Sequence, residues 1–288
     1  MAKTKVRIDG RTAFVSGAAS GIGRAVAQRL SAHGCPVAII DQNEAGLTET
    51  ADSLGGPVLA RRVDVSDRQA QMAFAAEVAE WAPAPLGMVF NNAGVTTSQG
   101  VAGGAMEDDE WVWSINFHGV VNGVRAFLPI LLGQRSGVIV NTSSVFGLIG
   151  FPLKSAYCAS KFAVQGFTDS LRQELRGTGV HAANVHPGGV KTNILRNARY
   201  HGDHRGRDFS QGEASDLFEQ LAQTTPERAA EIIHNGVKAG KSRILVGPDA
   251  YLFDGLVRLA PTRYDDVIAA IETIVDRAAS RRLGRPAR

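Results

Sequence analysis

The stretch Gly17-Ala-Ala-Ser-Gly-Ile-Gly23 follows an apolar segment, residues 11–16, and opens a helical pattern that ends at His33-Gly34. A second apolar segment, residues 37–40, comes next and leads directly into Asp41. Glycine permits a tight turn and lets a ligand's phosphates approach the N–H groups at the start of a helix. A strand, a glycine turn, a helix and a strand within about thirty residues predict the βαβ unit of a dinucleotide-binding fold.

Asp41 indicates which dinucleotide binds. A carboxylate at the end of the second strand can accept hydrogen bonds from both ribose hydroxyls of the adenosine half, and it repels a 2′-phosphate. No lysine or arginine stands at Ala19, Ser20 or Gln42 to neutralise such a phosphate. We therefore expect NAD and not NADP. The glycines run Gly-x-x-x-Gly-x-Gly, which departs from the generic fingerprint, so a tight turn without a ligand is the alternative.

The alternation of apolar strands and helical patterns continues along the chain. Further strands are predicted at 57–63, 86–90, 138–140 and 180–185, with a last one at 243–246. This order predicts an α/β fold, a Rossmann-type doubly wound parallel sheet in a single domain, with ligands at the carboxyl ends of the strands. The residues at those ends are Gly17, Asp41, Asp64, Asn91, Ser144 and Pro187.

Tyr157 and Lys161 lie four residues apart on a helix predicted from Ser155 onward, so they share one helix face. A positive charge about 5 Å from a phenol, at an effective dielectric constant of about 20, favours the phenolate by roughly 3 kcal/mol. We therefore expect a lowered pKa for Tyr157, which would let it exchange a proton with an alcohol near neutral pH. Taken alone, such a pair is also typical of an exposed helix surface.

With these motifs assembled, the chain resembles the short-chain dehydrogenase/reductase family across roughly residues 8 to 250. The matching motifs are Gly17-x-x-x-Gly21-Ile-Gly23, Asp64-Val65, Asn91-Asn-Ala-Gly94, Asn116, Ser144, Tyr157-x-x-x-Lys161 and Pro187-Gly-x-x-x-Thr192. The interval from Ser144 to Tyr157 is the usual one in that family, which selects Ser144 over Ser143. Ser16 stands where the family usually has threonine, but a hydroxyl is kept.

The resemblance implies four catalytic residues. Tyr157 would be the acid and base, and Ser144 would bond the substrate oxygen. Lys161 would tune Tyr157 and bond the nicotinamide ribose, while Asn116 would hold a water that links Lys161 to solvent. The implied contacts of NAD are Gly17, Ser20, Gly21, Ile22, Gly23, Asp41, Asp64, Val65, Asn91, Ala93, Gly94, Tyr157, Lys161, Pro187, Gly188, Val190 and Thr192.

Apolar residues around Ser144 predict a hydrophobic substrate site. The expected lining residues are Val95, Phe146, Phe151, Leu153 and Ile194, with Leu148 and Ile149 nearby, although some of these will be core residues. Such a wall favours an aryl, terpenoid or steroid-like secondary alcohol or ketone. In relatives the segment after the Pro-Gly motif covers the substrate, so we expect a lid at about 194–225, with a short helix at 216–223 whose Leu217, Phe218 and Leu221 face the cleft.

The remaining segments suggest no second activity. His201-Gly-Asp-His204 has no cysteine or third histidine close in sequence, so we expect no metal. The family domain is expected to span 1–250, followed by a C-terminal extension, 251–288, with an apolar helical stripe over 265–281. We expect the extension to pack on its own domain or on a sister subunit. Contact of its terminal arginines with a membrane surface is the alternative.

Composition excludes several other classes of protein. The chain has 288 residues, 44% of them hydrophobic and 20% charged, with a net charge of +3 from interspersed basic and acidic residues. We therefore expect no nucleic-acid partner, and without a contiguous apolar run of membrane length or a signal peptide we expect no membrane insertion and a cytoplasmic location. Cys35 and Cys158 are expected to be small buried side chains rather than a disulfide framework.

The sequence thus predicts an oxidoreductase that transfers hydride between NAD(H) and a secondary alcohol or ketone. Helices at 119–134 and 155–176 would form the interface of a homo-dimer or homo-tetramer, as in relatives. Two alternatives stay open. One is a non-catalytic NAD-binding sensor or partner-binding protein. The other is an epimerase or dehydratase with tightly bound NAD.

Overall fold

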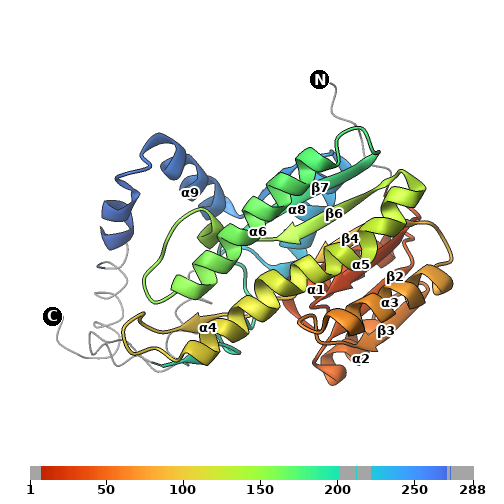
Figure 1. The fold of residues 1–288 in the computed structure, drawn as a ribbon, viewed down its shortest axis with the longest axis horizontal. Coiled ribbons are helices and arrows are strands. Elements are labelled where there is room, and N and C mark those ends of the chain that lie inside the picture. The colour runs from red at the N-terminus through yellow and green to blue at the C-terminus, as the bar shows by residue number, and fades with distance from the viewer. Residues whose placement is uncertain (1–7, 202–211, 213–221, 271–272, 274–288) are drawn as a thin grey trace.

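The computed structural model describes residues 8–201, 212, 222–270 and 273, and its centre is a seven-stranded parallel sheet (Figure 1). The strand order is β3-β2-β1-β4-β6-β7-β9. The strands are β1 Thr12–Ser16, β2 Val37–Asp41, β3 Val58–Arg62, β4 Leu86–Asn91, β6 Gly137–Thr142, β7 Val180–Pro187 and β9 Arg243–Val246. Every neighbouring pair is parallel. The prediction of a Rossmann-type doubly wound sheet in a single domain is confirmed.

Helices cover both faces of the sheet, as Figure 1 shows. The helices are α1 Gly21–Ala32, α2 Glu44–Asp52, α3 Arg68–Trp81, α4 Met106–Trp113, α5 Gly119–Gln134, α6 Ser155–Glu174, α8 Pro226–Lys238 and α9 Pro248–Leu259. Apolar side chains of α1 and α8, such as Leu30 and Ile233, fill the core on one face. Those of α3, α5 and α6, such as Phe127 and Leu171, fill it on the other. Because helices cover both faces, the central strands are buried throughout and read as continuous apolar runs.

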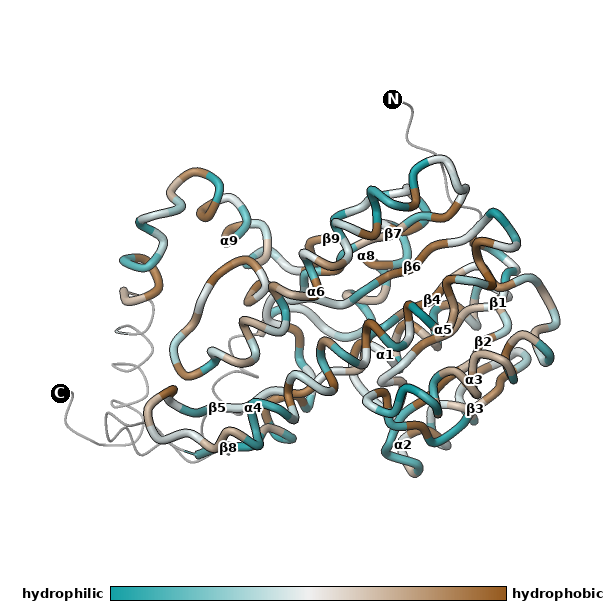
Figure 2. Tube along the Cα trace, in the orientation of Figure 1, coloured by the Kyte–Doolittle hydropathy of each residue, from teal (hydrophilic) through white to brown (hydrophobic). Residues whose placement is uncertain are grey.

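The order of the strands reverses between β1 and β4. From β1 the chain moves outward to β2 and β3, and then returns to the other side of β1 with β4. Crossovers on opposite sides leave a crevice at the carboxyl ends of these two strands, where ligands bind in such sheets. In Figure 2 hydrophobic residues follow the central strands, while hydrophilic residues gather on α2 and the outer turns.

A five-residue π-helix, η1 Ser114–His118, joins α4 to α5 without a loop. The combined helical run Met106–Gln134 is long and apolar enough, by length and composition alone, to cross a membrane. This was not expected from the sequence, because no contiguous apolar run reaches membrane length. In the structure Val120, Val124, Phe127 and Leu131 of this run are buried in the core against the sheet.

Two short elements lie outside the main sheet. β5 Thr97–Ser98 pairs in parallel with β8 Arg199–Tyr200, which brings the first part of the expected lid beside the end of β4. Cys35 and Cys158 are free and buried, as expected.

The structure describes only part of the lid and of the C-terminal extension. His204, Leu217, Phe218 and Leu221 lie outside the described residues, as do 271–272 and 274–288 of the predicted C-terminal helix. Residues 264–270 are helical, in agreement with the start of that prediction. Helix α9 was not predicted, and it crosses the expected domain boundary at residue 250.

Candidate active site

The carboxyl ends of β1, β2, β4 and β6 meet along one edge of the sheet because all strands run parallel. Each strand ends in a polar residue or leads directly into one: Ser16, Asp41, Asn91 and Thr142. Strand register sets Asn91 beside Asn141, and their side chains are hydrogen-bonded over 2.8 Å. The candidate site is built on this edge.

The glycine turn leaves space for a dinucleotide. Gly17 has a φ of 68°, and a Cβ placed on it would lie 2.7 Å from the Cα of Ala93, so only glycine lets the turn pack on the loop after β4. At the start of α1 the Ser20 side chain makes no capping bond, and the first turn holds no acidic residue. The uncapped N–H groups therefore suit an anionic pyrophosphate, and the residues fit a dinucleotide.

Ser16 ties this turn to the loop after β4. Its hydroxyl accepts hydrogen bonds from the backbone N–H groups of Asn92, over 3.0 Å, and Ala93, over 3.2 Å. The same hydroxyl donates to the carbonyl of Phe90. Since serine makes all three bonds through its hydroxyl, the departure from threonine leaves this connection intact.

Asp41 is held rigidly at the end of β2. One carboxylate oxygen accepts from the N–H of Ala19 and the other from the N–H of Asn43, both over 2.9 Å. On the neighbouring strand Arg62 pairs in register with Asp41, and its guanidinium donates to the carbonyl of Gln42. Sequence reasoning missed this arginine because it considered only positions adjacent to the turn and to Asp41.

The segment after β3 also stays in place through hydrogen bonds. Asp64 accepts from the backbone N–H and the hydroxyl of Ser66. The carbonyl of buried Val65 accepts from the side chains of Gln71 and Asn122. These hydrogen bonds therefore hold the segment after β3 in place along the β3 side of the crevice.

Tyr157, Lys161, Ser144 and Asn116 are all buried. The Lys161 ammonium donates to the carbonyl of Thr142 over 3.0 Å and lies 5.7 Å from the centroid of the Tyr157 ring. A Cβ placed on Gly94 would lie 3.2 Å from the Lys161 Nζ and 3.3 Å from the Asn116 Oδ1. The structure thus brings together around Gly94 residues that are far apart in the sequence.

Asn116 lies in the π-helix η1, and both ends of its side-chain amide are hydrogen-bonded, while its Oδ1 can accept one bond more. Its Oδ1 accepts from the N–H of Val95 over 2.8 Å. Its Nδ2 donates to the carbonyl of Val95 and to the hydroxyl of Ser160. A π-turn opens the helix locally and is frequent at functional sites.

The expected pKa of Tyr157 is wrong in direction. Burial raises the pKa of Tyr157 to about 12, and a hydrogen bond with Ser144 opposes the rise. Burial also lowers the pKa of Lys161 to about 8. The sequence argument counted the attraction between the two groups but not the loss of water around both, and desolvation disfavours each charged form.

Buried polar residues that were not predicted from the sequence support β6, the strand that leads to Ser144. Asn141 donates to the hydroxyl of Thr168 on α6 over 2.9 Å, which extends the bond between Asn91 and Asn141. The ring of His186, on β7, hydrogen-bonds the carbonyl of Ser144. Burial lowers the pKa of His186 to about 4, so the ring stays neutral. The sequence signal that could have revealed these residues is the presence of a polar residue, such as Asn141 or His186, within an apolar strand.

Of the expected substrate-lining residues, Val95, Phe146 and Ile194 pack against the apolar cluster that contains Tyr157. The ring of Phe146 meets that of Tyr157 edge-on at 6.2 Å and stacks on Phe151 at 5.0 Å. Leu148 and Ile149 belong to the core of a neighbouring cluster. Leu153 is not part of either cluster.

Leu153 has a left-handed φ of 61°, which is uncommon for a branched side chain. Its carbonyl accepts from the N–H of Gln99, and the next residue, Lys154, donates from its ammonium to the carbonyl of Thr97 over 2.7 Å. Leu153 therefore helps to set the turn that enters α6.

The Pro187-Gly-Gly loop closes the crevice from the other side. A Cβ placed on Gly21 would lie 3.1 Å from the Cγ2 of Thr192, so this loop reaches the glycine turn. Gly188 donates to the carbonyl of Val246, and Val190 forms an isolated bridge with Thr224. Asp249 of α9 accepts from the N–H of Gly189 over 2.5 Å.

The first part of the lid is fastened to α4. Buried Asp108 accepts from Arg199 over 2.6 Å and from His201. The Arg199 guanidinium also lies 4.0 Å from the centroid of the Trp111 ring. In the described part of the chain, no three histidine, cysteine or acidic side chains lie together as a metal site would require.

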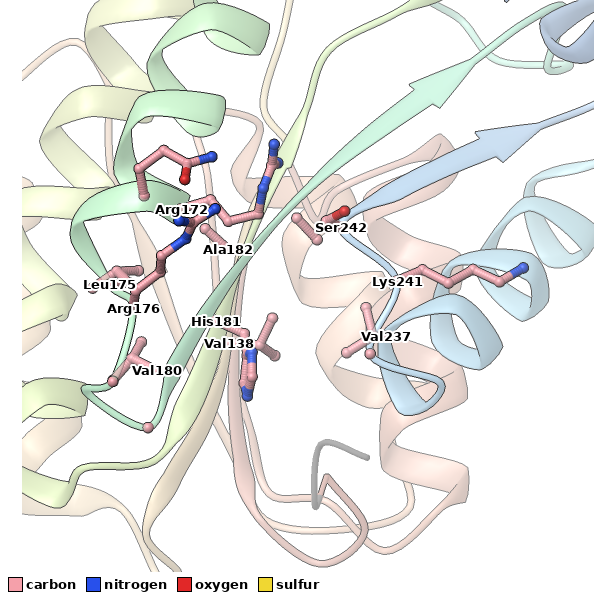
Figure 3. Close-up of a pocket in the computed structure, with 15 residues that line it drawn as sticks. Val138, Arg172, Leu175, Arg176, Val180, His181, Ala182, Val237, Lys241 and Ser242 are labelled. Atoms are coloured by element: carbon pink, nitrogen blue, oxygen red, sulfur yellow. The ribbon is translucent and has the colours of Figure 1, made fainter. Parts of the chain in front are cut away.

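A separate cavity of about 570 Å³ lies at the opposite end of β7 (Figure 3). It opens beside the amino end of β7, near Val180, and basic side chains surround it. These are Arg172, Arg176, His181 and Lys241. Lying at the amino ends of the strands, the cavity is remote from the edge that carries Tyr157 and Lys161.

Comparison with known proteins identifies the family. Residues 11–202 match the family described as short chain dehydrogenase. The putative oxidoreductase SadH of Mycobacterium tuberculosis is 41% identical over 269 residues, covering 91% of this chain and 95% of that protein. The chain belongs to the short-chain dehydrogenase family. It is therefore an oxidoreductase of a family that binds nicotinamide cofactors.

Similar proteins differ in the substrates and cofactors that their names give. Galactitol 2-dehydrogenase of Cereibacter sphaeroides is 34% identical, covering 78% of this chain and 84% of that protein. A family member from Burkholderia phymatum in complex with NAD has a TM-score of 0.77 at 29% identity, covering 98% and 97% of the two chains. Serine dehydrogenase with NADP+ has a TM-score of 0.72 at 26% identity, covering 83% and 95%.

Replacing Lys161 by methionine should stabilise the cofactor-free protein near pH 7, by up to about 3 kcal/mol, because a buried charge is removed. Below about pH 8 the folded protein bears the full cost of burying the charge. Between that value and the ordinary 10.5, the unfolded chain binds more protons than the folded one, so stability rises with pH.

The variant should therefore show a shallower rise in unfolding free energy between about pH 7 and about pH 9.5, measured by urea denaturation. Burial also lowers the pKa of Lys154 to about 8, so the informative quantity is the difference between variant and wild type. Exposed Lys241→Met is the matched control. Equal slopes in the wild type and Lys161→Met would contradict the prediction.

Proposed function

We propose that this protein is an NAD-dependent dehydrogenase that interconverts secondary alcohols and ketones bearing an apolar group. The observation that carries the proposal is the convergence of Ser144, Tyr157, Lys161 and Asn116 at the strand edge that also carries Asp41. Bound NAD would accept or supply the hydride. The chain's own residues would bind the substrate, orient it and move the proton.

In this proposal Tyr157 donates its phenolic proton to the substrate oxygen during reduction and takes a proton from the alcohol during oxidation. The Ser144 hydroxyl bonds the same oxygen as charge develops on it. Charged Lys161 lies beside the Tyr157 ring and favours the phenolate once the cofactor completes the site. Asn116 fixes the loop that carries Gly94 and Val95 and holds a water on the proton path to Lys161.

We further propose that NAD lies along the edge formed by the glycine turn, the strand ends and the Pro-Gly loop. The proposed contacts are Gly17, Ser20, Gly21, Ile22, Gly23, Asp41, Asp64, Val65, Asn91, Ala93, Gly94, Tyr157, Lys161, Pro187, Gly188, Val190 and Thr192. The preference for NAD rests on Asp41, whose charge opposes a 2′-phosphate. Arg62 is an argument for NADP, because it lies beside Asp41 in the sheet and its positive charge could neutralise a 2′-phosphate.

The apolar substrate class rests on the apolar cluster that includes Tyr157, against which Val95, Phe146 and Ile194 pack. A polyol such as galactitol, which one relative's name specifies, would need hydroxyl partners there. A sensor would need no buried tyrosine beside a buried lysine. An epimerase or dehydratase would show no net turnover of the cofactor.

The wider organisation also belongs to the proposal. Residues 1–250 form the catalytic domain with a lid at about 194–225, and residues 251–288 form an extension. The protein acts in the cytoplasm as a homo-oligomer assembled through α5 and α6. Leu132 and Phe162, on those two helices, are 38% and 43% exposed, which supports an interface there.

Replacing Tyr157 by phenylalanine should lower kcat for oxidation of a secondary alcohol by at least about 100-fold, because the proton-transferring hydroxyl is removed. NAD should still bind. The measurement follows NADH formation over aliphatic, aryl and steroidal alcohols, with the ketones tested in reverse. Tyr251→Phe, at an exposed tyrosine, is the control. NAD binding without turnover of any substrate by the wild type would favour the sensor.

Replacing Asp41 by asparagine should raise the ratio of kcat/KM for NADP to that for NAD by at least about tenfold, because a like-charge repulsion is removed. Asp64→Asn is the matched control. Its proposed contact is the adenine that both cofactors share, so it should leave the ratio unchanged. A wild-type protein that prefers NADP tenfold would overturn the cofactor assignment.

Light scattering should give a mass of two or four chains. Replacing both Leu132 and Phe162 by aspartate should shift the mass toward one chain, because charges would be buried in the proposed interface. A wild-type protein that is monomeric at micromolar concentration would refute the oligomer.

A further inference from the structure

Phe146 connects two apolar clusters. On one side its ring meets that of Tyr157 and packs against the cluster of Val112, Ala156 and Tyr157. On the other it packs with Phe151 and with a cluster centred on Leu148, Ile149 and Ile268. The second cluster therefore begins one side chain away from the proposed acid and base.

Phe146 also governs the position of Ser144. The two residues belong to a short 3-10 turn, η2 Val145–Gly147, which Ser144 caps. The N–H of Phe146 donates to the Ser144 hydroxyl over 3.1 Å. The backbone of Phe146 is thus bonded to the group proposed to bind the substrate oxygen.

The C-terminal extension supplies part of the second cluster. Ile268 is only 5% exposed and lies in its centre, and Tyr264 packs on the same cluster with Phe253 and Val257 of α9. The Tyr264 hydroxyl lies 3.8 Å from the point where a Cβ on Gly150 would stand. Because residues 264–270 are helical, positions 264 and 268 share one face.

The neighbouring residues of this helix face away from the cluster. Val267 is 38% exposed, and Asp265 and Asp266 are exposed as well. The inward face is thus apolar and the outward face is charged. An inward apolar face that ends at Phe146 offers an apolar substrate group a surface without polar partners.

We propose that Tyr264 and Ile268 of the C-terminal extension form the outer wall of the substrate site and select substrates whose apolar group reaches beyond Phe146. This inference rests on the proposed function. The preferred substrates would be secondary alcohols or ketones with a long or bulky hydrocarbon group. Each methylene buried against such a wall adds about fourfold to the affinity.

The test compares full-length variants on a homologous series of 2-alkanols, from 2-butanol to 2-decanol, with NAD. In the wild type kcat/KM should rise with chain length. Ile268→Ala and Tyr264→Ala should each lower the ratio of kcat/KM for 2-decanol to that for 2-butanol by about tenfold, mainly through KM. Val267→Ala, on the outward face, should leave the ratio unchanged.

A conservative variant separates a wall from a purely structural role. Ile268→Val removes one methylene and should lower the ratio by about two- to fourfold while retaining the fold, as judged by circular dichroism and Tm. A structural role alone would lower Tm without changing the preference. An unchanged ratio in folded Ile268→Val and Tyr264→Ala would overturn the wall.

Binding measurements keep this inference distinct from the proposed reaction. Calorimetric titration of 2-decanone and 2-butanone into the protein with NAD+, the oxidised cofactor, needs no turnover, because NAD+ has no hydride to transfer to the ketone. If the wild type binds 2-decanone more tightly, and Ile268→Ala loses that advantage while Val267→Ala keeps it, the wall stands even if no alcohol is oxidised. If the wild type binds both ketones equally or neither, the wall is wrong, whatever the fate of the reaction.

Discussion

The hydrogen bond from the Lys161 ammonium to the carbonyl of Thr142 is the contact on which the rest of the site depends. A buried charge needs a polar partner, and the end of a parallel strand supplies one because its last carbonyl no longer pairs within the sheet. The absence of a side chain at Gly94 gives the ammonium room. The bond sets the rotation of α6 against β6, and with it the direction of Tyr157, one helical turn earlier.

Much of the fold was predictable because its signals are local. A buried parallel strand is a continuous apolar run, and a helix that packs on it repeats its apolar residues at three- and four-residue steps, so order and type of element follow from the sequence. The predicted strand end at Asp41 and the predicted helix start at Ser155 both agree with the structure. Parallel pairing then requires that the strand ends meet, so the position of Ser144 at the same edge as Asp41 and Asn91 was predictable. The choice of Ser144, Tyr157 and Lys161 as a set came from the family resemblance and not from spacing alone.

What could not be predicted depends on contacts between distant segments. The direction of the Tyr157 pKa follows from how completely the site excludes water, which spacing does not encode. Arg62 comes beside Asp41 only through strand pairing. Helix α9 has apolar residues at helical steps, Ala250, Phe253 and Val257, but it was missed because the family domain was expected to end at residue 250. Its contacts through Asp249 to the Pro-Gly loop and through Asp254 to Arg243 join distant segments. Local sequence patterns predict helices and strands, whereas the pKa of a buried group and the neighbours of a charged group depend on tertiary packing.

The π-helix between α4 and α5 changes the phase of a helix that otherwise runs without interruption. A π-helical turn, with its i→i+5 hydrogen bonds, contains one residue more than an α-helical turn. The apolar residues before the turn therefore lie on a different face of the helix from those after it. Before the turn, Val112 points toward Tyr157 and Asp108 toward the lid, whereas after it Val124 and Phe127 point into the sheet. One continuous helix thus packs against the site and the lid with its first part and against the sheet with its second. Deleting a single residue to regularise it would align the apolar residues on one face and cost the protein one of those contacts.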